Sequence, residues 1–305
     1  MEETEFIWMN GKMVPWKDAK IHVLTHSLHY GTAVFEGIRC YDTPKGPAIF
    51  RLKDHVKRLL DSAHIVQVKA NFTQKEYEDA CKAVVSKNKL KECYIRPIVY
   101  FGYGQMGLAT GKCGVDSAIA AWPWGVYLGE DGVKNGIRMK ISSYTRHHVN
   151  VMLTKSKTTG NYVNSTLAKM EALNAGYDEA IMLDAQGYIS ECSGENIFIV
   201  RDGVLITPPA TNALEGITRK SMLEVAAAEG IEAREELFTR DQLYISDEAF
   251  LTGTAAEVTP IREVDNRTIG AGKPGQVTKK LQARFYDIIH GKDKKFEKWL
   301  DYVEK

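Results

Sequence analysis

The chain has 305 residues, which at about 150 residues per domain predicts about two domains. Its 40 Lys and Arg residues stand against 39 Asp and Glu, so the formal net charge of +1 gives no surplus that points to nucleic acid or to an anionic membrane surface. No uncharged stretch reaches the roughly 18–20 apolar residues that a membrane span needs. We therefore expect a soluble protein without nucleic-acid or membrane partners.

The N-terminus and the cysteines indicate a cytoplasmic location. The segment Met1-Glu2-Glu3-Thr4-Glu5 is acidic, the opposite of the positively charged start of a secretory signal. The cysteines are odd in number, scattered and without a C-x-x-C pair, so the sequence predicts reduced thiols and no zinc site: Cys40, Cys81, Cys93, Cys113 and Cys192. We also expect no metal at His147-His148, because adjacent residues do not share one face of a helix or strand.

Strands and helices are mixed in the first half. Apolar, β-branched and aromatic runs predict strands, and apolar residues three or four positions apart predict helices. The second helix is the better marked, because Thr73 and Glu76 form a capping box at its start. In chain order we predict strands over 6–8 and 48–51, helices over 54–63 and 73–85, and strands over 94–103 and 117–122.

The glycine-containing segment 123–136 predicts an interdomain loop, between a small N-terminal domain over 1–122 and a larger domain over 137–305. The pattern lacks the regular β-α-β alternation of a doubly wound sheet, so we expect two α+β domains. In the second half we predict a strand over 137–142, a helix over 160–175, strands over 179–183, 197–200 and 204–207, a helix over 218–228 and a last helix ending at Gly291.

Two glycine-containing turns are candidate anion sites, because free backbone N–H groups and the helix dipole favour negative charge. Gly216-Ile217-Thr218 leads into a predicted helix, and Gly253-Thr254-Ala255-Ala256 follows an apolar run. Neither continues as a P-loop. Taken alone, an ordinary N-cap threonine and a strand-end turn explain them more simply. Spacing alone likewise favours a solvated basic face for Arg51, Lys53, Lys57 and Arg58, and composition alone favours a surface position for Glu191.

The segment Glu191-Cys192-Ser193-Gly194-Glu195-Asn196-Ile197-Phe198 resembles the signature of the class IV aminotransferases, which are pyridoxal-phosphate enzymes of fold type IV. Further segments look like elements of this family, in the family's order: His29-Tyr30-Gly31, Phe35-Glu36-Gly37-Ile38-Arg39, Tyr94-Ile95-Arg96-Pro97, Lys157-Thr158-Thr159-Gly160-Asn161-Tyr162, Gly216-Ile217-Thr218-Arg219 and Gly253-Thr254-Ala255-Ala256-Glu257. Within the class, three segments are most similar to branched-chain amino-acid aminotransferases: Tyr94-Ile95-Arg96, Met106-Gly107-Leu108 and Pro123-Trp124-Gly125-Val126-Tyr127. The resemblance implies a D-amino-acid-aminotransferase-like fold, with a small α/β domain and a larger domain containing a pseudo-barrel.

The resemblance also implies a bound pyridoxal 5'-phosphate. Lys157 would carry the cofactor and act as the base that moves the α-proton, and Glu191 would hold the pyridine nitrogen protonated. Lys155 competes with Lys157, because residues two apart on a strand share a face, and only the spacing to the Gly160-Asn161-Tyr162 segment selects Lys157. The other implied cofactor-binding residues are Arg58, Tyr162, Glu195, Ile217, Thr218, Gly253 and Thr254. No metal is implied.

One pocket of such an enzyme accepts both apolar side chains and the charged side chain of glutamate. By resemblance, Arg96 with the hydroxyls of Tyr30 and Tyr127 would bind the γ-carboxylate of glutamate. The α-carboxylate would be held by Tyr94 and by the backbone N–H groups of Thr254 and Ala255. The apolar walls and remaining substrate-binding positions would be Phe35, Tyr30, Gly37, Tyr162, Met106, Leu108, Trp124 and Tyr127. In relatives the segments equivalent to Tyr30 and Met106–Leu108 reach in from a second subunit, which implies a homodimer or hexamer.

The implied activity is exchange of an amino group between L-leucine, L-isoleucine or L-valine and 2-oxoglutarate. D-amino-acid aminotransferase and aminodeoxychorismate lyase are alternatives with the same fold. A catalytically silent protein that binds a phosphate-containing ligand is the alternative of another class.

Overall fold

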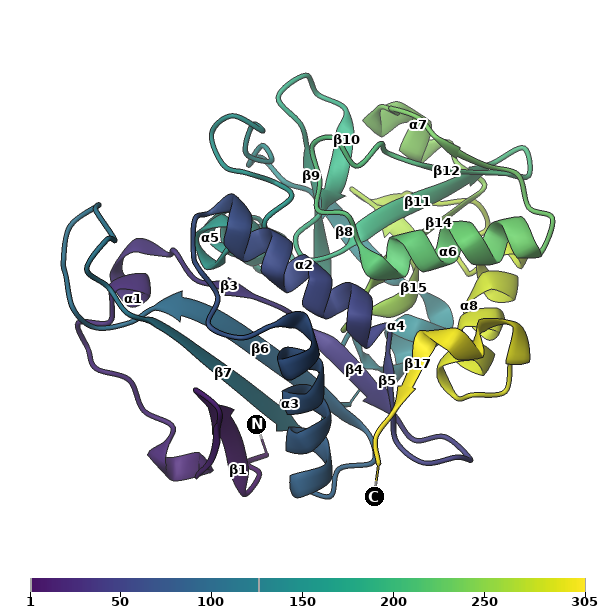
Figure 1. Ribbon diagram of the computed structural model, residues 1–305. Helices are drawn as coiled ribbons and strands as arrows, with labels where there is room; N and C mark the ends of the chain where they lie inside the picture. Colours follow the sequence, from purple (N-terminus) through teal and green to yellow (C-terminus); the bar gives the residue numbers. More distant parts are fainter. Residues whose placement is uncertain (1, 126, 305) are drawn as a thin grey trace. The chain divides into compact units, whose positions relative to one another are not determined.

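The computed structural model describes residues 2–125 and 127–304, so Met1 and Val126 of the segments above lie outside the described residues. The chain forms two compact units, and most of their helices and strands are labelled in Figure 1. Unit 1 comprises Met1–Gly125, Ser156–Asn161 and Ile288–Lys305, and unit 2 comprises Val126–Lys155 and Tyr162–Asp287. The domain division predicted at 123–136 stays a prediction.

Unit 1 is built on an antiparallel sheet of eight strands in the order β17-β5-β4-β6-β7-β1-β2, with β3 paired to β6. The C-terminal strand β17 pairs with β5, so the two ends of the chain belong to one sheet. The strands are β1 (Phe6–Met9), β2 (Lys12–Pro15), β3 (Val34–Phe35), β4 (Ile38–Tyr41), β5 (Ala48–Phe50), β6 (Cys93–Phe101), β7 (Val115–Trp122) and β17 (Leu300–Tyr302). The helical segments are η1 (Trp16–Asp18), α1 (His26–Tyr30), α2 (Leu52–Ile65), α3 (Gln74–Lys87), η2 (Thr159–Asn161) and η3 (Lys294–Trp299).

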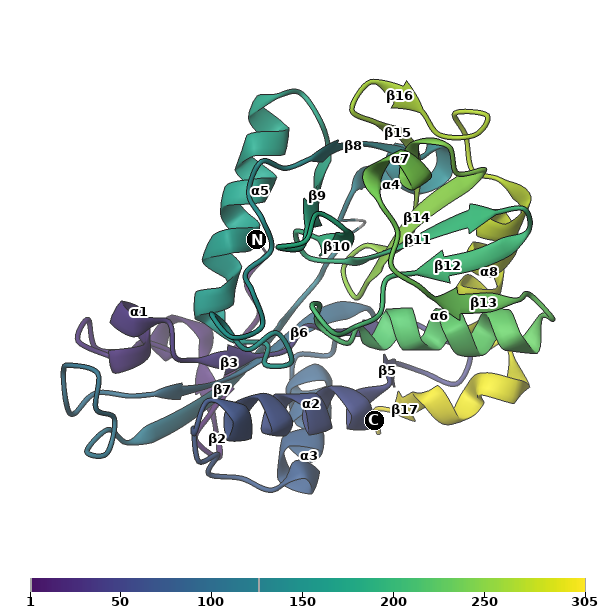
Figure 2. The same ribbon diagram turned by 90° about the horizontal axis from the view of Figure 1, so that it is seen from above.

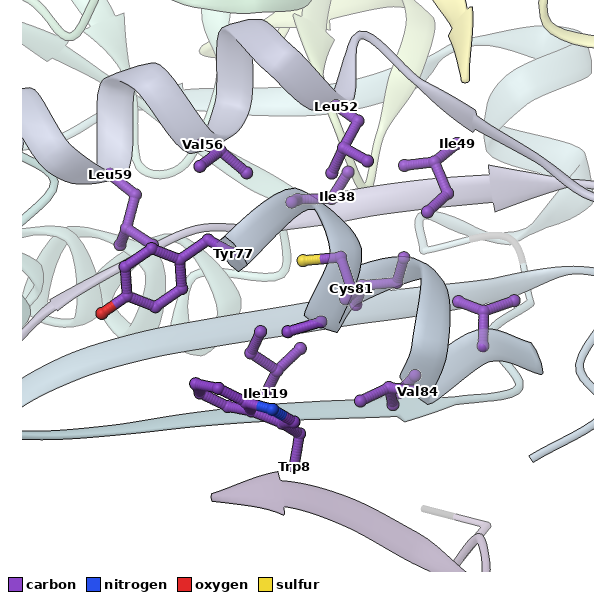
Figure 3. Packing of buried hydrophobic residues seen from close by; sticks show 14 of the residues in the cluster. Trp8, Ile38, Ile49, Leu52, Val56, Leu59, Tyr77, Cys81, Val84 and Ile119 are labelled. Carbon is purple, nitrogen blue, oxygen red and sulfur yellow. The ribbon is translucent and has the colours of Figure 1, made fainter. Parts of the chain in front are cut away.

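Helices α2 and α3 cover one face of this sheet, and the side chains between the helices and the sheet form the core of unit 1. The predicted capping box of α3 is confirmed: the Thr73 hydroxyl accepts from Glu76 N and the Glu76 carboxylate accepts from Thr73 N. Figure 3 shows the helix side chains facing those of the strands: Leu52, Val56, Leu59, Tyr77, Cys81 and Val84 from the helices, and Trp8, Ile38, Ile49 and Ile119 from the strands. Burial of each large apolar side chain contributes about 1.5–3 kcal/mol, so α2 is firmly fixed.

The basic residues around the start of α2 do not all lie on a solvated face, contrary to the prediction from spacing. Lys53 and Lys57 are exposed, but Arg51 is buried and the Arg58 side chain is only 14% exposed. Arg58 differs because its partner, Glu36, is itself fully buried, and Arg51 differs because its guanidinium packs 4.8 Å from the Trp299 ring centre besides pairing with Asp54.

Unit 2 is built on a mixed sheet of nine strands in the order β10-β9-β8-β15-β14-β11-β12-β13, with β16 paired to β15. Strand β8 runs parallel to both β9 and β15, β12 runs parallel to β13, and the other pairs are antiparallel. The strands are β8 (Ile137–Ile141), β9 (Glu179–Leu183), β10 (Ile189–Cys192), β11 (Asn196–Arg201), β12 (Val204–Thr207), β13 (Ala233–Glu235), β14 (Glu248–Gly253), β15 (Glu257–Val264) and β16 (Arg267–Thr268).

The helices of unit 2 pack against this sheet, α5 along β8 and β9 and α6 along β13 and β14 (Figure 2). They are α4 (Gly129–Asn135), α5 (Tyr162–Asn174), α6 (Ile217–Ala228), α7 (Arg240–Tyr244) and α8 (Gln276–Ile289), whose last two residues belong to unit 1. None of the helices in the described part of the chain has the length and apolar character needed to cross a membrane.

Part of the loop predicted over 123–136 is helical, since α4 lies within it. Glycines favour a loop in general, but Gly132 is buried, and a Cβ there would lie 2.9 Å from Ile137 Cγ2. Glu130 and Asp131 in the first turn favour the helix through its dipole. The glycine therefore serves close packing and does not break the helix.

Candidate functional site

The segment that carries Lys157 is fixed at its backbone. Lys157 N donates to Ser62 Oγ at 3.0 Å, and Lys157 O accepts from Phe35 N at 3.0 Å, so α2 and β3 hold it on both sides. The Nζ atom lies 5.0 Å from the centre of the Phe35 ring. Unit 1 thus brings the predicted cofactor lysine to the predicted substrate wall.

Glycines shape this segment. Gly160 N donates to Gly31 O at 2.9 Å, and a Cβ added at Gly31 would lie 2.9 Å from Gly160 Cα. Gly31 also has φ of 64°, in the left-handed region that glycine tolerates. The glycines of the His29-Tyr30-Gly31 and Gly160-Asn161-Tyr162 segments therefore serve one close backbone contact.

Lys155 differs from Lys157 in its surroundings. Lys155 lies in a turn, and Lys157 lies in an irregular segment just before the isolated bridge of Thr158 with Val34, so the two lysines do not share the face of one strand. Lys155 Nζ donates to the carbonyl oxygens of Ala210 and Ala213 and forms an ion pair with Glu215 at 3.2 Å. In unit 2, Lys155 thus stabilises the loop over 210–215, which precedes α6.

Arg58 projects from α2 and forms a two-bond pair with Glu36. Arg58 Nε donates to Glu36 Oε1 at 2.6 Å and Nη2 donates to Oε2 at 2.9 Å. His55, one turn earlier on α2, contacts Glu36 Oε2 through Nδ1 at 2.8 Å. Burial raises the pKa of Glu36, but the charge of Arg58 and the hydrogen bond from His55 outweigh it, so the net pKa is well below the usual range. The carboxylate is therefore ionised and fully paired.

A wall of aromatic rings with one guanidinium lies along β6 and β7. Arg96 Cζ lies 4.8 Å from the Phe35 ring centre and its Nη2 donates to Tyr94 Oη at 3.1 Å. The Tyr94 ring lies 5.2 Å from that of Trp124. A Cβ at Gly37 would lie 1.9 Å from Tyr94 Oη, so glycine is needed for the position of that hydroxyl. Unit 1 thus gathers most of the predicted substrate-binding residues.

Three further predicted substrate residues lie at a separate, exposed part of unit 1. Tyr30 Oη accepts from Gly107 N at 3.0 Å, which joins α1 to the 106–108 segment. Tyr30, Met106 and Leu108 are 38%, 43% and 88% exposed in the single chain. All three are large, mostly apolar side chains that the single chain leaves exposed.

In unit 2, Glu191 lies on β10 and is buried, which corrects the surface position favoured by composition. It forms an ion pair with Arg146 Nε at 2.7 Å, and both side chains are less than 10% exposed. Its Oε2 also accepts from Leu214 N at 3.2 Å and Asn196 Nδ2 at 3.4 Å. Sequence reasoning missed Arg146, because a lone arginine in an irregular segment gives no local signal.

The start of α6 has the features of an anion site. Gly216, the N-cap residue, has no side chain to occupy the first N–H groups of the helix. A Cβ there would lie 1.9 Å from Asn196 Oδ1, and Ile217 and Thr218 are buried. Asn196 also donates to Leu214 O at 3.1 Å. The turn before α6 and the Glu191 carboxylate are therefore held by the same asparagine.

The second predicted anion turn, 254–256, follows β14. A Cβ at Gly253 would lie 3.0 Å from Glu195 Cγ. Burial, and then the neighbouring Glu179 carboxylate, raise the pKa of Glu195 above its usual range. Next to the turn, Thr252 Oγ1 is buried without a hydrogen-bond partner among the described residues, which suits a site completed by a ligand.

Tyr162 and Tyr127 belong to unit 2, whereas Phe35, Arg96 and Trp124 belong to unit 1. Tyr162 is the first residue of α5. Tyr127 is 42% exposed, and Lys169 Nζ lies 5.7 Å from its ring centre. Their predicted contacts with cofactor and substrate stay predictions. Over residues 2–125 and 127–304, no cluster of His, Cys, Asp and Glu has the make-up of a metal site.

A family model described as amino-transferase class IV matches residues 33–264. The chain belongs to this family. Its fold is accordingly the class IV aminotransferase fold, as the sequence predicted.

Known class IV aminotransferases resemble this one over their whole length. A branched-chain-amino-acid aminotransferase of Pseudomonas aeruginosa is 52% identical over 298 residues, 98% of this chain and 97% of the relative. A crystal structure of the Escherichia coli branched-chain amino acid aminotransferase is 47% identical, with a TM-score of 0.97, and the match covers 99% of this chain and 100% of that one. The branched-chain amino acid aminotransferase of Thermobaculum terrenum, crystallised in its PLP form, has a TM-score of 0.94 at 34% identity and covers 100% of each chain.

Proposed function

We propose that this class IV aminotransferase exchanges the amino group between L-leucine, L-isoleucine or L-valine and 2-oxoglutarate. The observation that carries the proposal is the position of Phe35 in unit 1. Its ring lies 5.0 Å from Lys157 Nζ and 4.8 Å from Arg96 Cζ. One apolar ring thus borders both a reactive amine and a group suited to a carboxylate, which meets the need to accept apolar and acidic side chains in turn.

The residues present suit pyridoxal 5'-phosphate, which the Thermobaculum terrenum relative holds in its PLP form. Lys157 and Arg58 of unit 1, and Glu191, Ile217, Thr218, Gly253 and Thr254 of unit 2, would hold it, with support from Tyr162 and Glu195. The buried Glu191 carboxylate suits a protonated ring nitrogen, and the uncapped start of α6 suits a phosphate. When bound, this cofactor supplies an acceptor for the electron pair that the α-carbon releases.

The chain's own residues then orient the substrate and move its proton. Lys157 Nζ accepts the α-proton, and the fixed backbone of its segment limits where that amine can reach. Tyr94 Oη and the N–H groups of Thr254 and Ala255 bind the α-carboxylate. Arg96 and Tyr127, with Tyr30 supplied by a second copy of the chain, bind the γ-carboxylate of glutamate. The apolar side chains contact Phe35 and Trp124, and Met106 and Leu108 of the second copy.

The test is a comparison of amino donors with 2-oxoglutarate as acceptor. We expect turnover of L-leucine, L-isoleucine and L-valine with kcat/KM values no more than about 10- to 200-fold apart, since one methylene changes apolar pocket binding by about 1–3 kcal/mol. Preference for D-alanine would instead indicate D-amino-acid aminotransferase. Release of pyruvate from aminodeoxychorismate would indicate aminodeoxychorismate lyase. A colourless protein without turnover would indicate a catalytically silent binding protein.

Arg96→Leu should impair glutamate much more than leucine. Loss of a charge-assisted pair to the γ-carboxylate removes about 1.5–3 kcal/mol, which predicts a roughly ten- to hundredfold lower kcat/KM for glutamate. The value for leucine should change less than threefold. Tyr103→Phe, at an exposed position of the same unit, is the control, and equal losses for both donors would contradict the role of Arg96.

We further propose a homodimer or hexamer in the cytoplasm. The exposure of the large, mostly apolar side chains of Tyr30, Met106 and Leu108 supports self-association. The five cysteines are free thiols, four of them buried, which suits a reducing compartment. Light scattering tests the oligomeric state, and cell fractionation tests the location.

The domain division at 123–136, with domains over 1–122 and 137–305, also remains our proposal, and limited proteolysis tests it.

A further inference from the structure

The carboxylate of Glu36 is buried in unit 1 and has no part in the function proposed above. It lies between β3 and β4, and the residue is 0% exposed. Its two oxygens receive the two Arg58 bonds and the His55 contact, and Gly37 N adds a longer bond of 3.3 Å to Oε2. An ionised carboxylate in such a place is costly unless it is fully paired, and apolar residues often serve a core at least as well.

The geometry of this cluster fixes a direction. Two roughly parallel bonds, 2.6 Å and 2.9 Å long, join the guanidinium of Arg58 edge-on to the carboxylate. Such a pair sets the plane of the guanidinium and limits its rotation. His55, 1% exposed, holds Oε2 at 2.8 Å and thereby limits rotation of the carboxylate itself. Both His55 and Arg58 stand on α2, which the core of unit 1 fixes.

We propose that Glu36 and His55 are positioning residues that hold the Arg58 guanidinium in the orientation in which it binds the cofactor phosphate. The inference rests on the proposed function, which assigns the phosphate to Arg58. The negative charge of Glu36 repels a phosphate, so electrostatics alone predicts that removal of this charge strengthens phosphate binding. Orientation predicts the opposite result, and the sign of the change distinguishes the two.

The experiment compares two probes on the full chain after its cofactor has been removed: pyridoxal 5'-phosphate and pyridoxal, which lacks the phosphate. Both dissociation constants are measured by tryptophan fluorescence. The ratio of the dissociation constant of pyridoxal to that of pyridoxal 5'-phosphate isolates what the phosphate contributes to binding. For Glu36→Gln we expect this ratio to fall about ten- to hundredfold, as for loss of one charge-assisted hydrogen bond. The affinity for pyridoxal should stay within about threefold. His55→Gln should lower the ratio less, and Arg58→Met should lower it at least as much as Glu36→Gln does.

Val56→Ala is the matched control. Val56 is fully buried on the same helix but belongs to the apolar core. We expect it to lower the melting temperature while leaving the ratio unchanged, which separates loss of stability from loss of orientation. Should Glu36→Gln not fold, His55→Gln decides the question by the same measurement.

Two results overturn the inference alone. In one, the ratio is unchanged in Glu36→Gln and His55→Gln although Arg58→Met lowers it at least about tenfold. In the other, the ratio rises in Glu36→Gln, so the carboxylate only weakens the charge of Arg58. If the wild type binds both probes equally, or Arg58→Met leaves the ratio intact, the assignment of the phosphate in the proposed function fails instead.

Discussion

Lys157→Ala should lower the rate of transamination by at least about 10²- to 10⁴-fold, because it removes both the covalent anchor of the cofactor and the base for the α-proton. The measurement is kcat with L-leucine and 2-oxoglutarate under saturating cofactor. Borohydride reduction followed by peptide mapping gives a second result, because the wild type should carry the label at Lys157. The variant should bind the cofactor reversibly and give no labelled peptide.

Lys155→Ala is the control, since it removes the same charge two residues away. Lys155 holds the carbonyl oxygens of Ala210 and Ala213, so its loss should loosen the loop before α6 and weaken cofactor binding. With saturating cofactor its kcat should stay within about tenfold of the wild type. A label found on Lys155, or wild-type turnover by Lys157→Ala, contradicts the assignment.

The two lysines show where prediction from the sequence ends. Their spacing is a local property and fits either residue, and the family segment alone favours Lys157. What distinguishes their surroundings is contact with distant parts of the chain: Phe35 and Ser62 for Lys157, and the 210–215 loop for Lys155. No periodicity or composition encodes such contacts.

Local sequence signals were sufficient to predict a helix and its start where the apolar pattern and an N-cap agreed. The capping box placed the start of α3 correctly. Helix α5 was also predicted, yet its buried residues are the small Ser165, Ala168 and Ala172, whereas the apolar Leu167, Met170 and Leu173 are nearly half exposed. Close packing on β8 and β9 favours small side chains, so apolar residues alone did not identify the buried face. Short elements such as α1 and α4 lack enough periodicity to be predicted.

Charged partners of the site were the hardest to predict. Glu36 lies inside a quoted family segment, but only the fold shows that it faces Arg58 and His55 on α2. Arg146 lies outside every quoted segment and pairs with Glu191 through tertiary contact alone. In both cases a residue of a family segment pairs with a residue elsewhere in the sequence, and only the folded structure shows which residue that is.

Glu191→Gln should reduce kcat about 10²- to 10³-fold, because the neutral amide cannot stabilise a positive charge on the cofactor ring. It should also destabilise the protein. Arg146 is 7% exposed, and its other contacts, to Ser165 Oγ at 3.2 Å and Asn164 Oδ1 at 3.4 Å, are neutral. Removal of one partner of a buried ion pair leaves the other charge uncompensated and costs about 3–5 kcal/mol.

The double variant Glu191→Gln/Arg146→Met separates the two effects. With both charges gone, no uncompensated charge is left, so the free energy of unfolding should return to within about 1–2 kcal/mol of the wild type in urea titrations. Turnover should stay low, because the ring nitrogen still lacks its carboxylate. Recovery of both stability and kcat would mean that Glu191 acts only through folding. Recovery of stability alone assigns the carboxylate to the chemistry and Arg146 to the task of keeping it buried, ionised and in place.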